Sequence, residues 1–342
     1  MRRPLALESK TMTALPRLPR LRVVLLATAT CLLPVTAGAA RPVELPMQTT
    51  CSFSNMVNDL RRGLREGSPT YRRYLLAHFK EAALAMPPDE LLKAVAQEHE
   101  PAVLEAMGAA LATKAANTGD HDLVQTLLQR SVSDGDPALR AAALRSMERT
   151  GSVEMMEKNG AVVSYAQLIK DPSPEVRAVV ASNLIAESGQ VYFGHDQRVS
   201  EMAVSAALAS PDPALTAKLL REVSMEKVGP ETVDQIRGQL RAESPELRAA
   251  AATALGGVPG SQSPGARGAL VELYRNEKDP AVRKAALAGI ARLGLVGSRG
   301  TLESLRGVAP AMDAEIDAWL GALKRNVQDW NLLLREKERI RK

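Results

Sequence analysis

The sequence has few cysteines and few aromatic residues. Its 342 residues include two cysteines, Cys31 and Cys51, and only 3% of them are Phe, Trp or Tyr. Two cysteines exclude a disulfide framework and a zinc site built from cysteines. Apolar residues make up 45% of the chain, so it has enough material for a buried core and is not disordered by composition.

The chain also lacks an excess of charge outside its N-terminus. The net charge of +5 is carried by residues 1–39, and the remaining 303 residues hold 38 basic and 38 acidic side chains. Phosphate binding requires a concentration of Lys and Arg. The balanced charge of the body therefore argues against nucleic acid as a partner.

Long hydrophobic runs are absent apart from one, at 23–35. Arginines precede this run and the small residues 37–40 follow it, which is the order of a secretory signal. We predict that residues 1–39 are a signal peptide cleaved after Ala39 or Ala40. The mature protein is then expected in the periplasm or outside the cell.

Lipidation is the alternative form of export. It would require acylation of Cys31, but the residues before Cys31 lack the Leu and the Gly or Ala that a lipobox places there. A membrane is therefore expected as a partner only if Cys31 is lipidated. Cys51 would be the single cysteine of the mature chain, and no neighbouring His or Lys would activate its thiol.

Eight prolines recur at intervals of 30 to 39 residues, and each begins the same pattern. They are Pro69, Pro101, Pro137, Pro174, Pro213, Pro245, Pro280 and Pro310. The side chains two, six and ten residues after each proline are all apolar, which places one apolar stripe along an α-helix. Ser or Asp precedes six of the eight prolines, as is typical of a helix start.

A second helix is predicted in each unit, for example at 161–170 and 267–276. Glycines such as Gly256 are expected to end the first helix in a left-handed conformation. Two helices in a unit of about 34 residues cannot bury a core alone, so the units must stack into a solenoid.

Two units are especially alike, with DPALRAAAL at 136–144 and DPAVRKAAL at 279–287. They resemble short bacterial HEAT repeats of the PBS-lyase-like type. The resemblance covers residues 68–322 and implies an all-α fold, a right-handed, armadillo-like α-solenoid of about eight HEAT-like helix pairs. Residues 40–67 would form an N-terminal lead-in, and residues 323–342 a charged C-terminal capping helix.

An arginine recurs three residues after the proline. The HEAT resemblance implies that such arginines form a structural ladder, bonded to acids or carbonyls of neighbouring units. The predicted members are Arg72, Arg140, Arg177, Arg248 and Arg283, with Asp136 and Asp279 at the acid position. A row that binds polyanions is the alternative, and the balanced charge of the surroundings argues against it.

No residues have the spacing of a catalytic or metal site. The histidines, His78, His99, His121 and His195, lie in different units, and no pair is spaced to place two ligands on one helix face. We predict no catalytic residue, no metal and no cofactor, and a protein that is not an enzyme. The alternative is a metal- or ligand-dependent enzyme on a HEAT scaffold, of the His-metal type or similar to bilin lyases. A bilin pocket needs aromatic lining, of which this chain has little.

One segment, 188–196, interrupts the repeat and carries Tyr192, Phe193 and His195. These residues are candidate contacts for a protein partner, because exposed aromatic residues are typical of interface hot spots. The alternative is that the two aromatic rings fill a gap between units. A second candidate, for acidic partners, is the cluster of Arg61, Arg62, Arg65, Arg72 and Arg73, which is otherwise a solvated end of the solenoid. The sequence thus predicts a non-catalytic exported scaffold that binds protein partners on its solenoid surface.

Overall fold

The computed structural model of this protein describes residues 53–151, 165–189 and 198–341, which all belong to the compact unit Thr50–Lys342. Within these ranges the regular elements are all helices. The predicted signal peptide, both cysteines and the residues Tyr192, Phe193 and His195 lie outside the described residues. No described helix combines the length and the apolar character needed to cross a membrane.

Seven of the eight recurring prolines begin an α-helix, as predicted. These helices are α2 (Pro69–Ala85), α4 (Pro101–Thr118), α6 (Pro137–Ser146), α9 (Pro174–Ser188), α11 (Pro213–Glu222), α13 (Pro245–Leu255) and α15 (Pro280–Gly294). The eighth, Pro310, begins the 3-10 turn η5 (Pro310–Met312), which leads into α17 (Asp313–Leu323). Backbone N–H groups of the first turn are capped by the side chains of Ser68, Asp136, Asp212, Ser244 and Asp279, whereas Ser173 makes no such bond.

A second helical segment follows each of these helices. The segments are α3 (Pro88–Gln97), η1 (His121–Val124) with α5 (Gln125–Ser133), α8 (Tyr165–Leu168), α10 (Arg198–Ala209), α12 (Pro230–Gly238) with η2 (Gln239–Arg241), η3 (Gly260–Gln262) with α14 (Ser263–Asn276), and η4 (Leu295–Ser298) with α16 (Arg299–Glu303). Two further helices lie at the ends of the series, α1 (Phe53–Glu66) before α2 and α18 (Trp330–Arg341) after α17. Helix α1 lies within the segment expected as a lead-in.

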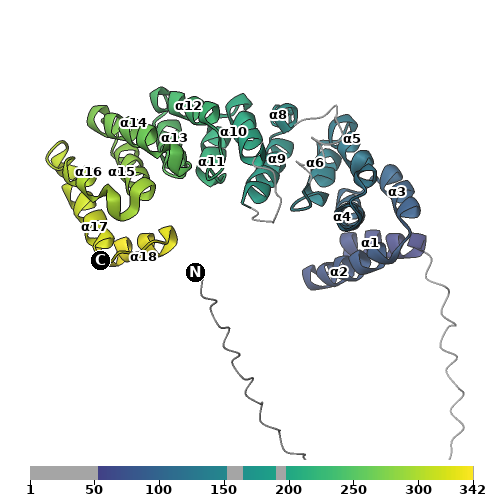
Figure 1. Cartoon of the computed structure of the whole chain (residues 1–342). Coiled ribbons are helices and arrows are strands. Elements are labelled where there is room, and N and C mark those ends of the chain that lie inside the picture. Colours follow the sequence, from purple (N-terminus) through teal and green to yellow (C-terminus); the bar gives the residue numbers. More distant parts are fainter. Residues whose placement is uncertain (1–52, 152–164, 190–197, 342) are drawn as a thin grey trace, which may run out of the picture. The chain divides into compact units, whose positions relative to one another are not determined.

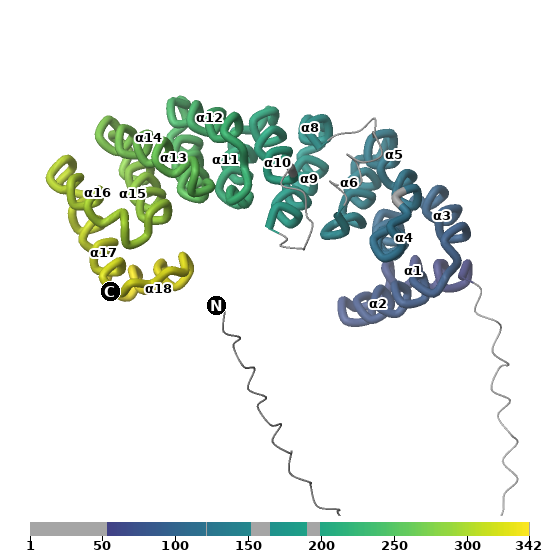
Figure 2. The backbone as a smooth tube through the Cα atoms, in the orientation of Figure 1, coloured from purple at the N-terminus to yellow at the C-terminus, as the bar shows by residue number. Residues whose placement is uncertain are grey.

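The helices that begin at proline pack on one another in chain order and form one layer, while the second helices form the other (Figure 1). The tube in Figure 2 follows this alternation between the layers from α2 to α17. Every residue of the predicted apolar stripe is buried or half-buried except Tyr71 on α2. The described residues thus form an all-α solenoid, as the periodicity predicts.

Gly256 shows why one detail of the prediction was wrong. It follows α13 with a φ of −66°, so it does not end the helix in a left-handed conformation. A Cβ at Gly256 would lie 2.7 Å from the Cα of Gly289 on α15. Glycine is required there because two stacked helices approach each other closely, not because of the backbone angle.

The C-terminal helix α18 is attached through aromatic rings and a buried ion pair. The rings of Trp319 and Trp330 stack with centroids 5.5 Å apart. Lys337 is 7% exposed, and its Nζ lies 2.5 Å from Glu315 and 4.7 Å from the centre of the Trp319 ring. This helix therefore covers the apolar side of α17, where no further repeat follows.

Candidate binding surfaces

The ladder arginines Arg140 and Arg248 connect consecutive units in the same way. Arg140 donates from Nε and Nη2 to the carboxylate of Asp171, both at 2.9 Å. Arg248 donates equivalently to Glu277 at 2.6 and 3.0 Å. In both arginines Nη1 donates to two backbone carbonyls of the turn before its own helix. Each guanidinium therefore fixes its own turn and the turn of the next unit.

The acids of this ladder differ from those that the sequence predicted. Asp136 and Asp279 accept N–H groups in the first turn of their own helices, which orients both carboxylates away from the arginines. The acids that bind the arginines, Asp171 and Glu277, lie three residues before the next proline. Glu98 has the same position before Pro101 and accepts two bonds from Arg61 of α1, at 2.8 and 2.9 Å. This recurrence of an acid was present in the sequence and was missed.

Electrostatics at the ladder favour the charged acids. The hydrogen bonds from Arg248 lower the pKa of Glu277 to about 2 against the effect of burial, and the N–H groups of Asp279 and Lys278 contribute to the same shift. Burial by itself would raise the pKa of Asp171, but the bonds from Arg140 and from a backbone N–H outweigh it, so that pKa is also lowered. Carboxylates held in this way stabilise the folded state.

The other predicted ladder arginines have no carboxylate partner among the described residues. Arg72 donates to the carbonyls of Gly67 and Arg65, and Arg177 donates to two carbonyls of its preceding turn. Arg283 lies over the ring of Tyr274, 5.8 Å from its centre. The predicted row is thus anchored mainly on the backbone.

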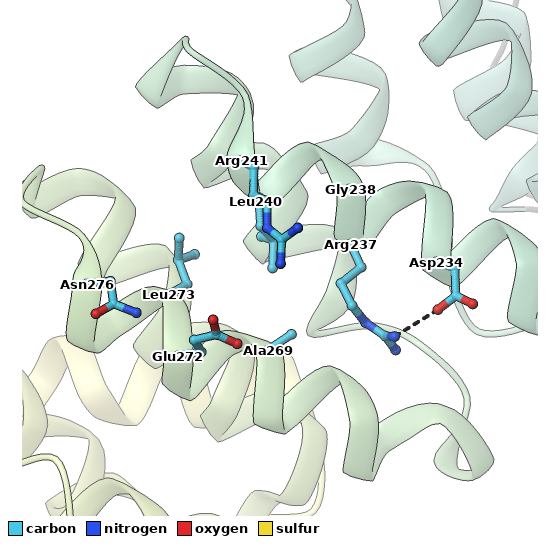
Figure 3. Close-up of a pocket in the computed structure, with 9 residues that line it drawn as sticks. All are labelled: Asp234, Arg237, Gly238, Leu240, Arg241, Ala269, Glu272, Leu273 and Asn276. Atoms are coloured by element: carbon cyan, nitrogen blue, oxygen red, sulfur yellow. Dashed lines mark ion pairs between the residues drawn. The ribbon is translucent and has the colours of Figure 1, made fainter.

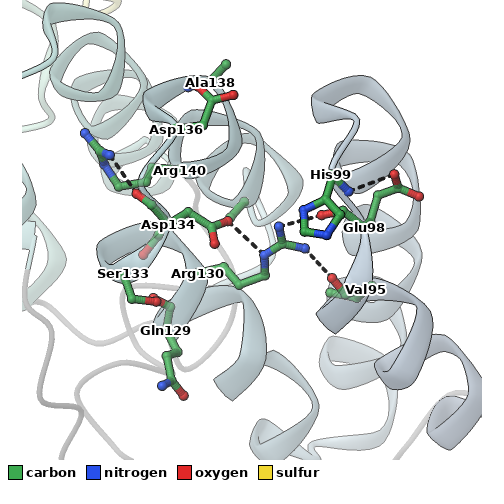
Figure 4. Close-up of polar contacts among 12 residues, drawn as sticks. Val95, Glu98, His99, Gln129, Arg130, Ser133, Asp134, Asp136, Ala138 and Arg140 are labelled. Carbon is green, nitrogen blue, oxygen red and sulfur yellow. Dashed lines mark hydrogen bonds and ion pairs between the residues drawn. The ribbon is translucent and has the colours of Figure 1, made fainter.

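Arg130 on α5 is a buried polar contact that the sequence did not reveal (Figure 4). It is 7% exposed, pairs with Asp134 at 2.8 Å, and donates to the carbonyls of Val95 and Glu98 at the end of α3. It therefore joins two second helices. His99 lies beside this contact, and in the part of the chain that the structure describes no group of three or more His, Cys, Asp or Glu side chains could hold a metal ion.

A groove of about 580 Å³ lies between α12–η2 and α14, in the layer of second helices (Figure 3). Its lining consists of Asp234, Arg237, Gly238, Leu240, Arg241, Ala269, Glu272, Leu273 and Asn276. Leu240 is buried, and Ala269 and Leu273 are half-buried, so the apolar side chains form its bottom. At one end Arg237 pairs with Asp234 at 2.8 Å.

Three polar side chains of the groove are exposed and unpaired. Arg241, Glu272 and Asn276 form no side-chain hydrogen bond or ion pair with any other residue of the described ranges. They project from both walls of the groove (Figure 3). The groove therefore offers an anion, a cation and an amide above an apolar bottom.

The predicted arginine cluster at the N-terminal end does not form one patch. Arg61 is bound to Glu98, and Arg62 pairs with Asp59 at 2.7 Å. Beside them, two tyrosines of α2 are exposed, Tyr71 by 51% and Tyr74 by 63%. Tyr71 was expected in the core, but no preceding repeat covers this side of α2.

Comparisons with known proteins support the repeat assignment. The family model described as HEAT repeats matches residues 200–291 and 233–318. The solved structure of the Escherichia coli protein YibA is 11% identical, with a TM-score of 0.45 over 85% of this chain and 95% of that chain. A solved engineered protein is 15% identical, with a TM-score of 0.42 over 83% of this chain and 77% of that chain. No curated protein sequence matches this chain.

Proposed function

Because this chain is a HEAT-repeat protein with an all-α solenoid fold, we propose that it is a non-catalytic scaffold that binds protein partners. Stacked repeats present an extended surface on which a polypeptide can lie. The groove between α12–η2 and α14 is the observation that carries this proposal.

The polar groups of the groove favour a polypeptide over other ligands. Arg241 and Glu272 have opposite charges and no partner in the described structure, so a ligand that pairs with both must itself carry both charges. Polypeptides do so, whereas nucleic acids and anionic lipid surfaces present one sign of charge. The apolar bottom at Leu240 and Leu273 would receive an apolar side chain of the same segment.

Photo-crosslinking in the producing cells tests this proposal. Benzoylphenylalanine in place of Asn276 should give a crosslinked protein adduct, and the same residue in place of Lys284 on α15 should not. Exchanging the groove charges, with Arg241→Glu and Glu272→Arg together, should remove the adduct because both ionic contacts become repulsive. An adduct that persists after the charge exchange, or that forms equally at position 284, would contradict a binding groove.

The proposal includes export through the N-terminal segment. The mass of the natively expressed protein should correspond to a chain that begins at Ala40 or Arg41, and a retained N-terminus would contradict cleavage. A diacylglycerol group on Cys31 would instead make the scaffold a membrane-tethered one. Stoichiometric iron or zinc in the purified mature protein would contradict the non-catalytic role.

A further inference from the structure

One side of the N-terminal end of the solenoid has no repeat packed against it. Helix α2 contacts α1 and α4 and buries Phe79 and Ala83 on the side toward them. The opposite side is exposed, because no repeat precedes α2 in the stack. Terminal repeats usually have a polar outer face, so the exposed Tyr71 and Tyr74 depart from what a simple cap requires.

These tyrosines form an ordered aromatic surface. Tyr71, Tyr74 and His78 are three and four residues apart, which places them near one another on the helix. The rings of Tyr74 and His78 are stacked, with centroids 6.1 Å apart and planes at 10°. Rings that are already fixed lose little conformational entropy when a partner binds.

Positive charge without a carboxylate partner lies beside these rings. Arg73 forms no hydrogen bond or ion pair within the described ranges. Arg72 and Arg65 are held by backbone carbonyls, which orient the guanidinium groups without neutralising them. We call the combination of Tyr71, Arg73, Tyr74 and His78 the α2 face.

We propose that the α2 face binds an acidic segment of a protein partner, at a site separate from the groove between α12–η2 and α14. Tyr and Arg are the residues enriched at interface hot spots, and unpaired guanidinium groups bind carboxylates in charge-assisted hydrogen bonds. The charge and the rings are therefore complementary to a segment that combines acids with an aromatic or aliphatic anchor.

A membrane or a nucleic acid would fit the α2 face less well. Glu66 and Glu81 lie near the arginines and would repel a continuous layer of phosphates. The exposed side of α2 carries no Trp, Phe, Leu or Ile that could enter a bilayer. A flexible segment can place its acids near Arg73 and avoid Glu81, which lies two turns further along the helix.

Fluorescence anisotropy with the full mature chain tests the proposal. The probe is a fluorescein-labelled peptide of alternating Glu and Gly with one central Phe, at low salt. Arg73→Glu should weaken binding about tenfold because an attraction becomes a repulsion. Tyr74→Ser should weaken it to a similar degree, with an unchanged melting temperature, because the ring is mostly exposed.

Two matched variants give the experiment its specificity. Lys284→Glu on α15 changes the net charge as Arg73→Glu does and should leave binding unchanged. Arg241→Glu in the groove should also leave it unchanged, so that failure of the α2 face and failure of the groove can be distinguished. Equal losses in Arg73→Glu and Lys284→Glu, or no binding by the unmodified chain, would overturn the proposal. Tighter binding of phosphatidylglycerol vesicles or single-stranded DNA through Arg73 would overturn it in favour of those ligands.

Discussion

Replacing Glu277 with Gln tests whether the ladder stabilises the solenoid. The side chain is 9% exposed, accepts two bonds from Arg248 at 2.6 and 3.0 Å, and accepts the N–H groups of Lys278 and Asp279. Its pKa falls from the ordinary 4.5 to about 2. A shift of this size corresponds to about 3 kcal/mol of folding free energy in favour of the ionised form.

The pH dependence of this contribution has a definite sign. The pKa of Glu277 is lower in the folded chain than in the unfolded chain, so its stabilisation is complete above about pH 4.5 and is lost as the pH falls through about 2. Gln carries no charge at any pH. Glu277→Gln should therefore lower the free energy of unfolding by up to about 3 kcal/mol at pH 7, and the two proteins should approach equal stability near pH 2.

Urea unfolding followed by circular dichroism measures the change, and hydrogen exchange in α13 and α15 shows whether it is local. The second measurement is needed because stacked repeats can unfold in parts. Asp59→Asn is the matched control, since it breaks an exposed ion pair with Arg62 and should change stability by less than about 1 kcal/mol. The reasoning fails if Glu277→Gln is no more destabilising than this control, or if its effect is the same at pH 7 and pH 2.

Three other changes give separate expectations. Gly289→Ala should lower the free energy of unfolding by about 1–3 kcal/mol because a Cβ there would lie 2.8 Å from a carbonyl oxygen of α13, whereas Gly268→Ala, in open space on α14, should be neutral or slightly stabilising. Equal melting temperatures for the two variants would contradict this. Lys337→Met should destabilise the chain by about 3 kcal/mol, because its carboxylate partner on α17 stays buried without a counter-ion, and unchanged hydrogen exchange in α18 would count against it. Replacing Tyr192 and Phe193 with Ser should weaken partner binding by on the order of 2 kcal/mol at nearly constant melting temperature, and the opposite pattern would show that the rings fill a gap.

The positions of the helices could be predicted because local chemistry decides them. Pro at the first helical position and a preceding Ser or Asp specify a helix start from neighbouring residues alone. This prediction was confirmed from Pro69 to Pro280. At Pro310 the local rule gave only a 3-10 turn, and the α-helix began three residues later at Asp313. Adjacent residues were therefore enough for helix starts in most units.

The ladder partners could be predicted only in part, because they depend on contacts between units. The recurring arginine was visible in the sequence, but two acids were available near each one. Only the stacked turns show that Arg248 reaches Glu277, 29 residues further on, while Asp279 is used by its own helix. A carboxylate next to proline is well placed for capping, and that local geometry takes precedence.

The candidate surfaces were less accessible to sequence reasoning than the fold. Tyr71 has the spacing of a core residue, yet it is exposed because its unit is the first of the stack and nothing packs on its outer side. The groove joins Arg241 to Glu272, which belong to different units and share no motif. Binding surfaces of this kind arise from the distance between neighbouring helices, which residue spacing does not encode.

The sequence by itself determined that the chain folds as a stack of helix pairs, since apolar side chains every four residues can be buried only if successive units cover one another. The tertiary structure decided which polar and aromatic side chains remain free. Glu277 and Lys337 are consumed by contacts inside the solenoid, whereas Arg73, Tyr74 and Arg241 are left at an end or between two helices. The physical reason is that burial and pairing depend on distances between residues remote in sequence, and those distances are set only when the repeats stack.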